Sequence, residues 1–401
     1  MCAVAGRATA AVAAPHPTLA DLVRAHGDAY RRTHRLARVQ TRALHAIAAC
    51  RTALLGGHRE RCDYCGATRL RYNSCRNRHC PTCQAQASAR WIDARRAELL
   101  PIPYFHVVFT LPHALNPLAQ GNPRVLYTLL FHAAAETLLT FGRDPRHLGG
   151  TIGITAILHT WSQTLTQHLH VHCLVTGGAL SPDRTRWIRG RAAFLFPVKA
   201  LSIVFRAKYL SGLQRAFHEG DLTFAAGTAS LADADRFAAW LAQLRATPWV
   251  VYAKRPFGGP AQVLQYLGRY THRIAISNAR LVRLLDGVVQ FRWKDYADHG
   301  RTKIMTLAVE EFLRRFLLHV LPRGFVRIRH FGLLANRQRR TTIARARQLL
   351  SVATPTTPSE DSPSADIDRT RCPVCHHGHW QVVEILRRLA SPLGPPTPDT
   401  S

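Results

Sequence analysis

Three histidines alternate with apolar residues in the segment His168-Leu169-His170-Val171-His172. Successive side chains of a β-strand point to opposite faces, so the three imidazoles would share one face and the apolar residues the other. The apolar face would pack on a core, while the histidine face would look into a site. Three imidazoles on one face favour a metal site over a strand that merely happens to be rich in histidine.

A metal ion held by His170 and His172 needs further ligands, and His168, Gln163 and His159 are the candidates for a third. Histidine nitrogen suits zinc, copper, nickel or manganese better than magnesium. A site that also uses the phosphate oxygens of a substrate could still hold Mg²⁺ or Mn²⁺, which would offset negative charge as it develops on the phosphate. The sequence does not choose among the three candidates.

Two tyrosines, Tyr266 and Tyr270, are separated by four positions, so a helix would place both phenols on one face. A phenol has an ordinary pKa of about 10 and needs a metal, a base or nearby cations before it becomes a nucleophile. Arg269 and Arg273 could supply the positive charge. An aromatic stripe facing a core is the alternative, but the neighbouring histidine strand in a very basic chain favours two catalytic tyrosines.

Two Cys-x-x-Cys pairs, Cys62 with Cys65 and Cys80 with Cys83, lie in a segment poor in aliphatic residues. Tetrahedral zinc holds such a segment folded without a hydrophobic core, so this spacing predicts a structural Zn²⁺ site resembling a zinc ribbon. Further ligands in the same segment could change the choice of four or bind a second ion; they are Cys75, His79 and His58.

The tail repeats this spacing once, at Cys372 and Cys375. A single pair is a weaker signal for a metal site, and a tail without any site is an equally good interpretation. Cys50 and Cys173 have no partner that the spacing reveals. Because the cysteines cluster as metal ligands do and no export signal precedes them, the expected compartment is a reducing cytoplasm.

The charge of the chain indicates its partner. The 54 Lys and Arg residues outnumber the 24 Asp and Glu residues by 30, and a polyanion such as nucleic acid is the natural partner of such a surface. No apolar run is long enough to span a bilayer, so no membrane partner is expected. The basic residues expected to contact DNA, against the alternative of a solvated surface, are Arg69, Arg71, Arg76, Arg78, Arg269 and Arg273.

Hydrophobic periodicity predicts the elements that would position these residues. Strands are predicted at 104–111, 151–159, 169–176, 249–253, 288–293 and 303–307. Helices are predicted within 17–56 and at 85–100, 124–141, 200–217, 231–244, 260–269, 308–320 and 336–350. Because strands and helices do not alternate regularly, the fold class is α+β with a largely antiparallel sheet.

Composition divides the chain into four parts. They are a disordered leader at 1–16, a helical and zinc-binding domain at 17–100, a catalytic domain at 101–350, and a low-complexity linker with a Cys/His tail at 351–401.

A strand with His-hydrophobic-His followed by a helix with Tyr-x-x-x-Tyr resembles the HUH endonuclease superfamily. The fuller order of motifs is similar to that of the bacterial insertion sequence 91 transposases, which carry an N-terminal zinc-binding domain. The motifs are Tyr72–Pro81, Phe105–Pro112, His170-Val171-His172, Tyr266–Arg273 and Arg314–Pro322, and the resemblance runs from about residue 19 to about residue 340.

That resemblance implies an HUH-type antiparallel sheet with flanking helices, preceded by the zinc-ribbon-like module. It implies that His170 and His172 bind the catalytic Mg²⁺ or Mn²⁺, and that Tyr266 and Tyr270 cleave single-stranded DNA and become joined to its 5′ phosphate. Movement would follow a rolling-circle-like route in the bacterial cytoplasm, at the nucleoid. The sequence has no phosphate-binding helicase loop, so host helicase or replication proteins would unwind the strands.

Two other functions remain open. A rolling-circle replication initiator or conjugative relaxase would use the same chemistry. A non-catalytic zinc-ribbon DNA-binding protein would explain the charge and the cysteines but leave the histidine strand and the tyrosine pair as coincidence.

Overall fold

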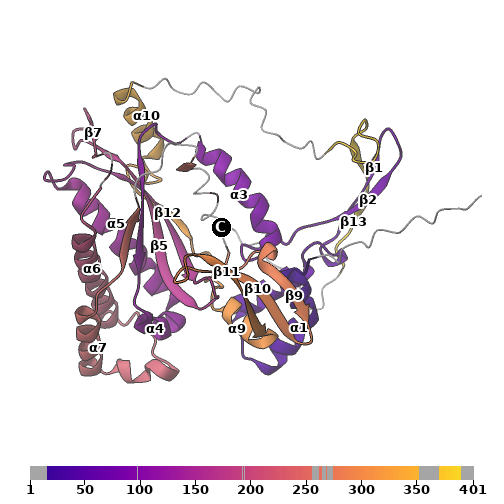
Figure 1. Ribbon diagram of the computed structural model, residues 1–401, viewed down its shortest axis with the longest axis horizontal. Helices are drawn as coiled ribbons and strands as arrows, with labels where there is room; N and C mark the ends of the chain where they lie inside the picture. The colour runs from indigo at the N-terminus through magenta and orange to yellow at the C-terminus, as the bar shows by residue number, and fades with distance from the viewer. Residues whose placement is uncertain are drawn as a thin grey trace, which may run out of the picture.

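The computed structural model describes residues 16–96, 98–191, 193, 195–254, 262, 263, 268, 274–351 and 370–389. A five-stranded antiparallel sheet forms its centre, in the order β12-β4-β5-β3-β8 (Figure 1). Its strands are β3 (Tyr104–Thr110), β4 (Gly153–Trp161), β5 (Gln167–Thr176), β8 (Val251–Lys254) and β12 (Ile328–Gly332). The antiparallel α+β class predicted from the sequence is therefore confirmed.

Helices cover one face of this sheet, where the odd-numbered residues of β5 point into the largest core. These helices are α4 (Asn116–Gly121), α5 (Pro123–Arg143), α6 (Val198–His218) and α7 (Ala234–Ala246). Leu169, Val171 and Cys173 are fully buried there, as the alternation of the histidine strand predicted.

Helix α5 is long and apolar enough to cross a membrane by length and composition alone, which the sequence analysis did not find. In the structure, 67% of its most apolar window is buried inside the protein. A core helix passes the same test, and α5 packs against α6 and the sheet.

The opposite face of the sheet carries a smaller core and the histidines. Ile157 of β4 and Leu174 of β5 lie in this core with Val263, which is completely buried. Helices α3 (Pro81–Arg96) and α10 (Arg339–Leu349) also contribute, through half-buried Trp91 and buried Ile343. Two short strands, β6 (Gly178–Leu180) and β7 (Trp187–Arg189), pair with each other beyond the end of β5.

A second lobe joins residues from distant parts of the sequence in one core. Helices α1 (Leu19–Thr33) and α2 (Arg38–Ala49) pack there with the sheet β11-β10-β9 and helix α9 (Val309–Leu317). The strands are β9 (Leu281–Leu285), β10 (Val288–Asp295) and β11 (Arg301–Ala308). The two N-terminal helices thus share a core with residues that the sequence analysis assigned to the catalytic domain.

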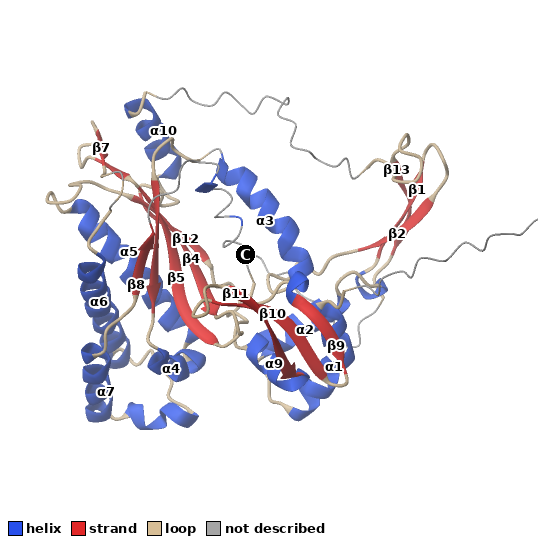
Figure 2. Ribbon diagram, viewed as in Figure 1, coloured by secondary structure: helices blue, strands red, loops and turns tan. Residues whose placement is uncertain are grey.

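A three-stranded sheet stands apart from the rest of the molecule, and we call it the arm (Figure 2). It contains β1 (Gly57–Cys62) in the middle, β2 (Thr68–Tyr72) on one side and β13 (Trp380–Leu386) on the other. The tail therefore returns to pair with the N-terminal module across more than 300 residues of sequence. Residues 1–15 of the leader predicted at 1–16, and residues 352–369 of the linker and tail predicted at 351–401, lie outside the described residues.

Candidate active site and cysteine clusters

Three histidines converge on the open face of the central sheet. His159 of β4 lies opposite His170 of β5 in the strand register, and His172 follows two residues later on the same face. One ring nitrogen from each of the three lies within 4.8 Å of the others. His159 is 2% exposed and His172 is 7% exposed, whereas His170 is half-buried. The cluster thus sits in a mostly dry site with an opening at His170.

Hydrogen bonds fix which ring nitrogens of this histidine cluster are available to a metal. The Nδ1 of His170 lies 2.8 Å from the backbone oxygen of His168, and because a carbonyl oxygen only accepts, Nδ1 must carry the proton. The lone pair of His170 is therefore on Nε2. The Nδ1 of His172 lies 2.9 Å from Nε2 of His106, which turns Nε2 of His172 away from that contact. Metal-binding histidines are oriented by such partners.

His106 is a residue that sequence reasoning did not single out, although it lies in a quoted motif. It is 4% exposed, and burial lowers its pKa to about 3, with Lys254 adding to the effect. A histidine with so low a pKa stays neutral at physiological pH. A neutral His106 can accept a hydrogen bond from His172 or donate one to it without adding positive charge beside a metal.

The donor set fits a divalent cation. Among the described residues, the cluster contains three imidazoles and no carboxylate. Neutral ligands leave the full charge of a bound cation to act on a phosphate, and nitrogen ligands favour Mn²⁺ over Mg²⁺.

The structure separates the three candidates for the third ligand. His159 joins the cluster. His168 instead contacts His113, with 3.3 Å between Nδ1 of His168 and Nε2 of His113. Gln163 lies in the turn between β4 and β5, where its backbone oxygen accepts a hydrogen bond from Arg280. His168 does not belong to the cluster.

Tyr266 and Tyr270, with Arg269 and Arg273, lie outside the described residues. Their neighbours Val263 and Gly268 are described, and both are helical. Val263 belongs to the core on the histidine face of the sheet, together with Leu174, which is two residues from His172. A methyl group placed on Gly268 would lie 2.6 Å from the side chain of Ile92 on α3, so the backbone of Gly268 lies close to α3.

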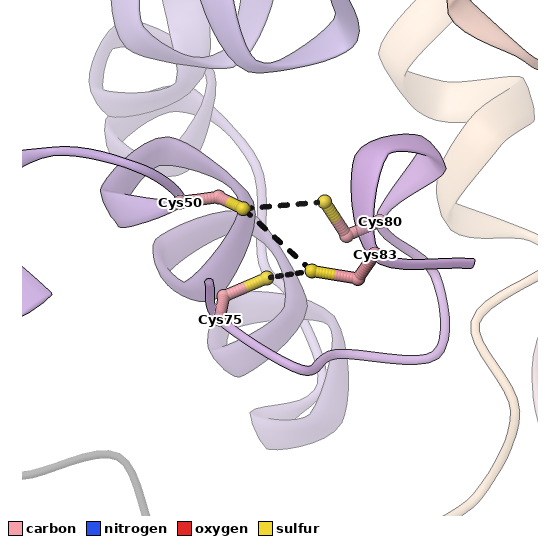
Figure 3. Close-up of side chains that lie close together, drawn as sticks. All are labelled: Cys50, Cys75, Cys80 and Cys83. Atoms are coloured by element: carbon pink, nitrogen blue, oxygen red, sulfur yellow. Dashed lines mark hydrogen bonds between the residues drawn. The ribbon is translucent and has the colours of Figure 1, made fainter. Parts of the chain in front are cut away.

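The cysteines form two separate clusters rather than the one site predicted from Cys62, Cys65, Cys80 and Cys83. We call the first the joint cluster; it consists of Cys50, Cys75, Cys80 and Cys83 (Figure 3). Its Sγ atoms lie 3.5 Å apart between Cys75 and Cys83, and 3.7 Å apart between Cys50 and Cys83.

The joint cluster connects two helices. Cys50 is the C-terminal cap of α2, and Cys83 lies in the first turn of α3. Four cysteine sulfurs gathered this closely match the donor set of a structural tetrahedral zinc site.

The second set, which we call the tail cluster, consists of Cys62, Cys65, Cys372 and Cys375. In the structure, Cys62 and Cys65 lie beside the tail pair, more than 300 residues away in sequence, rather than beside Cys80 and Cys83. The other two candidate ligands serve different purposes. His79 accepts a hydrogen bond from the backbone N–H of Leu321, and His58 pairs with Glu60.

The arginines expected to contact DNA differ in what holds them. Arg69 and Arg71 both pair with Glu60, and Arg69 also lies over the ring of Trp380 at 4.1 Å. Arg76 is exposed. The guanidinium of Arg78 is held inside the protein, where it donates to backbone oxygens of the segment that follows α9.

Known proteins resemble the chain over nearly its whole length. A family model described as "Transposase zinc-binding domain" matches residues 22–111, and one described as "Putative transposase" matches residues 153–341. "Putative transposase y4qJ" of Sinorhizobium fredii is 50% identical over 386 residues, which cover 94% of this chain and 97% of that relative.

A more distant relative carries the name of a mobile element. "Transposase for insertion sequence element IS801" of Pseudomonas savastanoi pv. phaseolicola is 28% identical over 84% of this chain and 82% of its own length. No solved structure matches the chain. The matched zinc-binding and transposase regions, together with these relatives, show that the chain belongs to the insertion sequence 91 family of transposases.

Proposed function

We propose that this transposase cleaves and rejoins single-stranded DNA through Tyr266 and Tyr270, with a divalent metal ion held by His159, His170 and His172. The observation that carries the proposal is the convergence of three imidazoles on one sheet face. Two further features support it. Hydrogen bonding puts the lone pair of His170 on Nε2, and Val263, three residues before Tyr266, is buried on the same face.

In the proposed reaction, the phenol oxygen of one tyrosine attacks a phosphorus atom of the DNA backbone. A bond forms between that oxygen and phosphorus, and the bond from phosphorus to the 3′ oxygen breaks. The tyrosine proton passes to solvent or a nearby base, and the departing oxygen takes up a proton to become a 3′ hydroxyl. A bound Mg²⁺ or Mn²⁺ would offset the charge that develops on the phosphate.

The linkage between tyrosine and the 5′ phosphate keeps the energy of the broken bond, so a later 3′ hydroxyl can attack it and restore DNA. With two tyrosines, one strand end can be held while the second is cut. This sequence of transfers would move the element by a rolling-circle-like route, with host helicase or replication proteins supplying single strands.

The basic surface would bind the ends of the element. Arg76 is exposed in the zinc-binding domain, and the formal charge of +30 favours a DNA partner throughout the chain. We expect the protein to act in the bacterial cytoplasm at the nucleoid.

A covalent trapping assay tests the proposal. The full-length protein is incubated with labelled single-stranded oligonucleotides from the ends of its element and Mn²⁺, and the products are separated on a denaturing gel. We expect a DNA-linked protein band that EDTA abolishes and that the double variant Tyr266→Phe/Tyr270→Phe lacks. The variant His170→Ala should also lack the band. Its matched control is His168→Ala, which changes a histidine outside the cluster and should retain the band.

Two other functions predict different results. A replication initiator or relaxase would form the same adduct, but on DNA of a plasmid origin rather than on the ends of an insertion sequence. A non-catalytic DNA-binding protein would bind the oligonucleotides without any covalent band, and the tyrosine variants would bind as well as the wild type.

A further inference from the structure

The tail cluster joins the arm to the C-terminal tail. The Sγ atoms of Cys62 and Cys375 lie 3.7 Å apart, as do those of Cys65 and Cys372, and all four lie within 4.8 Å of one another. All four cysteines are free thiols. A disulfide requires a sulfur–sulfur separation of about 2.0 Å, whereas four thiols at these distances surround a point that suits tetrahedral Zn²⁺.

The two Cys-x-x-Cys loops have matching backbone hydrogen bonds. The N–H of Gly66 donates to the oxygen of Cys62 at 3.1 Å, and the N–H of His376 donates to the oxygen of Cys372 at 2.9 Å. Each loop therefore folds back over its own pair of thiols.

Backbone donors also point at the sulfurs. The N–H of Cys65 donates to Sγ of Cys62 at 3.5 Å, and that of Gly378 donates to Sγ of Cys375 at 3.4 Å. Hydrogen bonds to a thiolate offset its charge, and such outer contacts are typical of a metal site.

A glycine is required where the two loops meet. A methyl group on Gly378 would lie 2.5 Å from Sγ of Cys62 and 2.6 Å from Oδ1 of Asp63, distances at which something must shift. The same loop is held by the N–H of His379, which donates to Oδ1 of Asp63 at 2.7 Å. The tail is thus shaped to fit the Cys62 loop closely.

The arm has little else to hold the tail in place. Strand β13 pairs with β1, and Arg59 forms an ion pair with Glu384. However, Val382 is 57% exposed and Ile385 is 78% exposed, so β13 buries little apolar surface. A small sheet without a hydrophobic core needs an additional cross-link to stay folded, and a structural zinc ion provides one.

We propose that Cys62, Cys65, Cys372 and Cys375 bind a structural zinc ion that fastens the C-terminal tail to the N-terminal arm. The joint cluster then binds a separate zinc ion. The family model for the zinc-binding domain ends at residue 111, so the tail supplies half of a site that this domain does not complete alone. The proposal does not depend on the tyrosine chemistry.

Zinc content in three paired variants of the full-length protein tests it. We expect Cys372→Ser/Cys375→Ser and Cys62→Ser/Cys65→Ser each to lose one equivalent of zinc relative to the wild type, and all four changes together to lose no more than one. Cys80→Ser/Cys83→Ser should lose a different equivalent. Val374→Ala changes an exposed residue of the same loop and should lose none.

One alternative gives an opposite pattern. If Cys62, Cys65, Cys80 and Cys83 shared a single ion, either N-terminal pair would remove it and the tail pair would remove nothing. An unchanged zinc content in Cys372→Ser/Cys375→Ser overturns the proposal.

A second measurement does not depend on removing any cysteine. A protease site is inserted between residues 352 and 369, in the Pro-, Ser- and Thr-rich linker, and the full-length protein is cut there. The tail should remain bound through gel filtration in the wild type and in Val374→Ala, and should separate in Gly378→Ala. A tail that separates from the zinc-loaded wild type contradicts the proposal.

Discussion

His106 lies beside His172, with 2.9 Å between Nε2 of the first and Nδ1 of the second and their rings stacked at a 14° angle. The contact is buried, and His106 lies on β3 rather than on β4 or β5, the strands that carry the proposed metal ligands. His106 therefore has the geometry of a positioning residue, which keeps the Nε2 lone pair of His172 aimed at a metal.

Loss of this contact should weaken metal binding. We expect His106→Phe to raise the Mn²⁺ concentration for half-maximal cleavage by about 10- to 100-fold, as for other outer-shell partners of metal-binding histidines. His106→Gln should recover part of the loss because its amide can still meet Nδ1 of His172.

Titration of DNA cleavage with Mn²⁺ measures this effect, and exposed His113 provides the control variant His113→Gln. A loss of activity in His106→Phe that saturating Mn²⁺ does not restore would argue for a purely structural role.

The ligand set also predicts which metal works best. Because the histidine cluster has three nitrogen donors and no carboxylate among the described residues, Mn²⁺ should activate cleavage at a lower concentration than Mg²⁺. Parallel titrations of cleavage after EDTA treatment measure the two concentrations. Activation at a lower Mg²⁺ concentration than Mn²⁺ would contradict this ligand set.

Substitutions of Arg78 and Arg76 should affect different properties, the first the stability of the protein and the second its DNA binding. Arg78 donates to the backbone oxygens of Leu321, Pro322 and Phe325, so Arg78→Ala should lower the free energy of unfolding by roughly 1.5–3 kcal/mol. Exposed Arg76 has a left-handed backbone (φ 53°), which alanine would share, so Arg76→Ala should change stability by less than about 0.5 kcal/mol.

DNA affinity should show the reverse pattern. If Arg76 contacts a phosphate, Arg76→Ala should reduce the slope of log affinity against log salt concentration by about 1, whereas Arg78→Ala should leave it unchanged. Urea unfolding and salt-dependent binding measure the two quantities. An Arg78→Ala protein that is as stable as the wild type would show that these hydrogen bonds do not hold the zinc-binding domain to the core.

His319 should make the protein sensitive to acid. It is 3% exposed, with Nε2 3.0 Å from the oxygen of Leu165, and burial lowers its pKa from 6.5 to about 4. The unfolded chain therefore binds the proton first. The contribution of neutral His319 to stability is full above pH 6.5 and is lost as the pH falls toward 4, by a few kcal/mol at most.

The measurement is the free energy of unfolding of the wild type and of His319→Gln at several pH values. The difference between the two should shrink between pH 6.5 and 4, because glutamine does not titrate. A difference that stays constant over this range would refute the assignment. Comparing two proteins cancels the acid sensitivity of the cysteine and histidine clusters, which both share.

Periodic patterns predicted the parts of the fold that depend on local sequence. The alternation around His170 gave the two faces of β5, and the apolar run at Tyr104 gave β3 within one residue. Partners distant in sequence were harder to predict. No local pattern links Cys62 to Cys375. The spacing of the histidines offered three equal candidates for a third ligand, and only the register of β4 against β5 shows that His159 lies opposite His170.

Short strands with few apolar residues escaped prediction for a different reason. β2 and β13 have only exposed or half-buried residues, and the buried residues of β1 are Gly57, Glu60 and Cys62, so these strands lack the apolar periodicity that reveals a strand. β12 was missed as well, since all five of its residues are half-buried at one edge of the sheet. Their pairing depends on the zinc-binding loops and on the sheet edge that they complete.

Mass spectrometry of the trapped adduct tests the central claim most directly. Trypsin cuts after Arg269, so Tyr266 and Tyr270 fall on different peptides and each can be assigned separately. After Mn²⁺-dependent reaction with a single-stranded element end and nuclease digestion, we predict a nucleotide joined through its 5′ phosphate to Tyr266 or Tyr270. An adduct on any other residue, or cleaved DNA with no adduct on either peptide, would contradict the account.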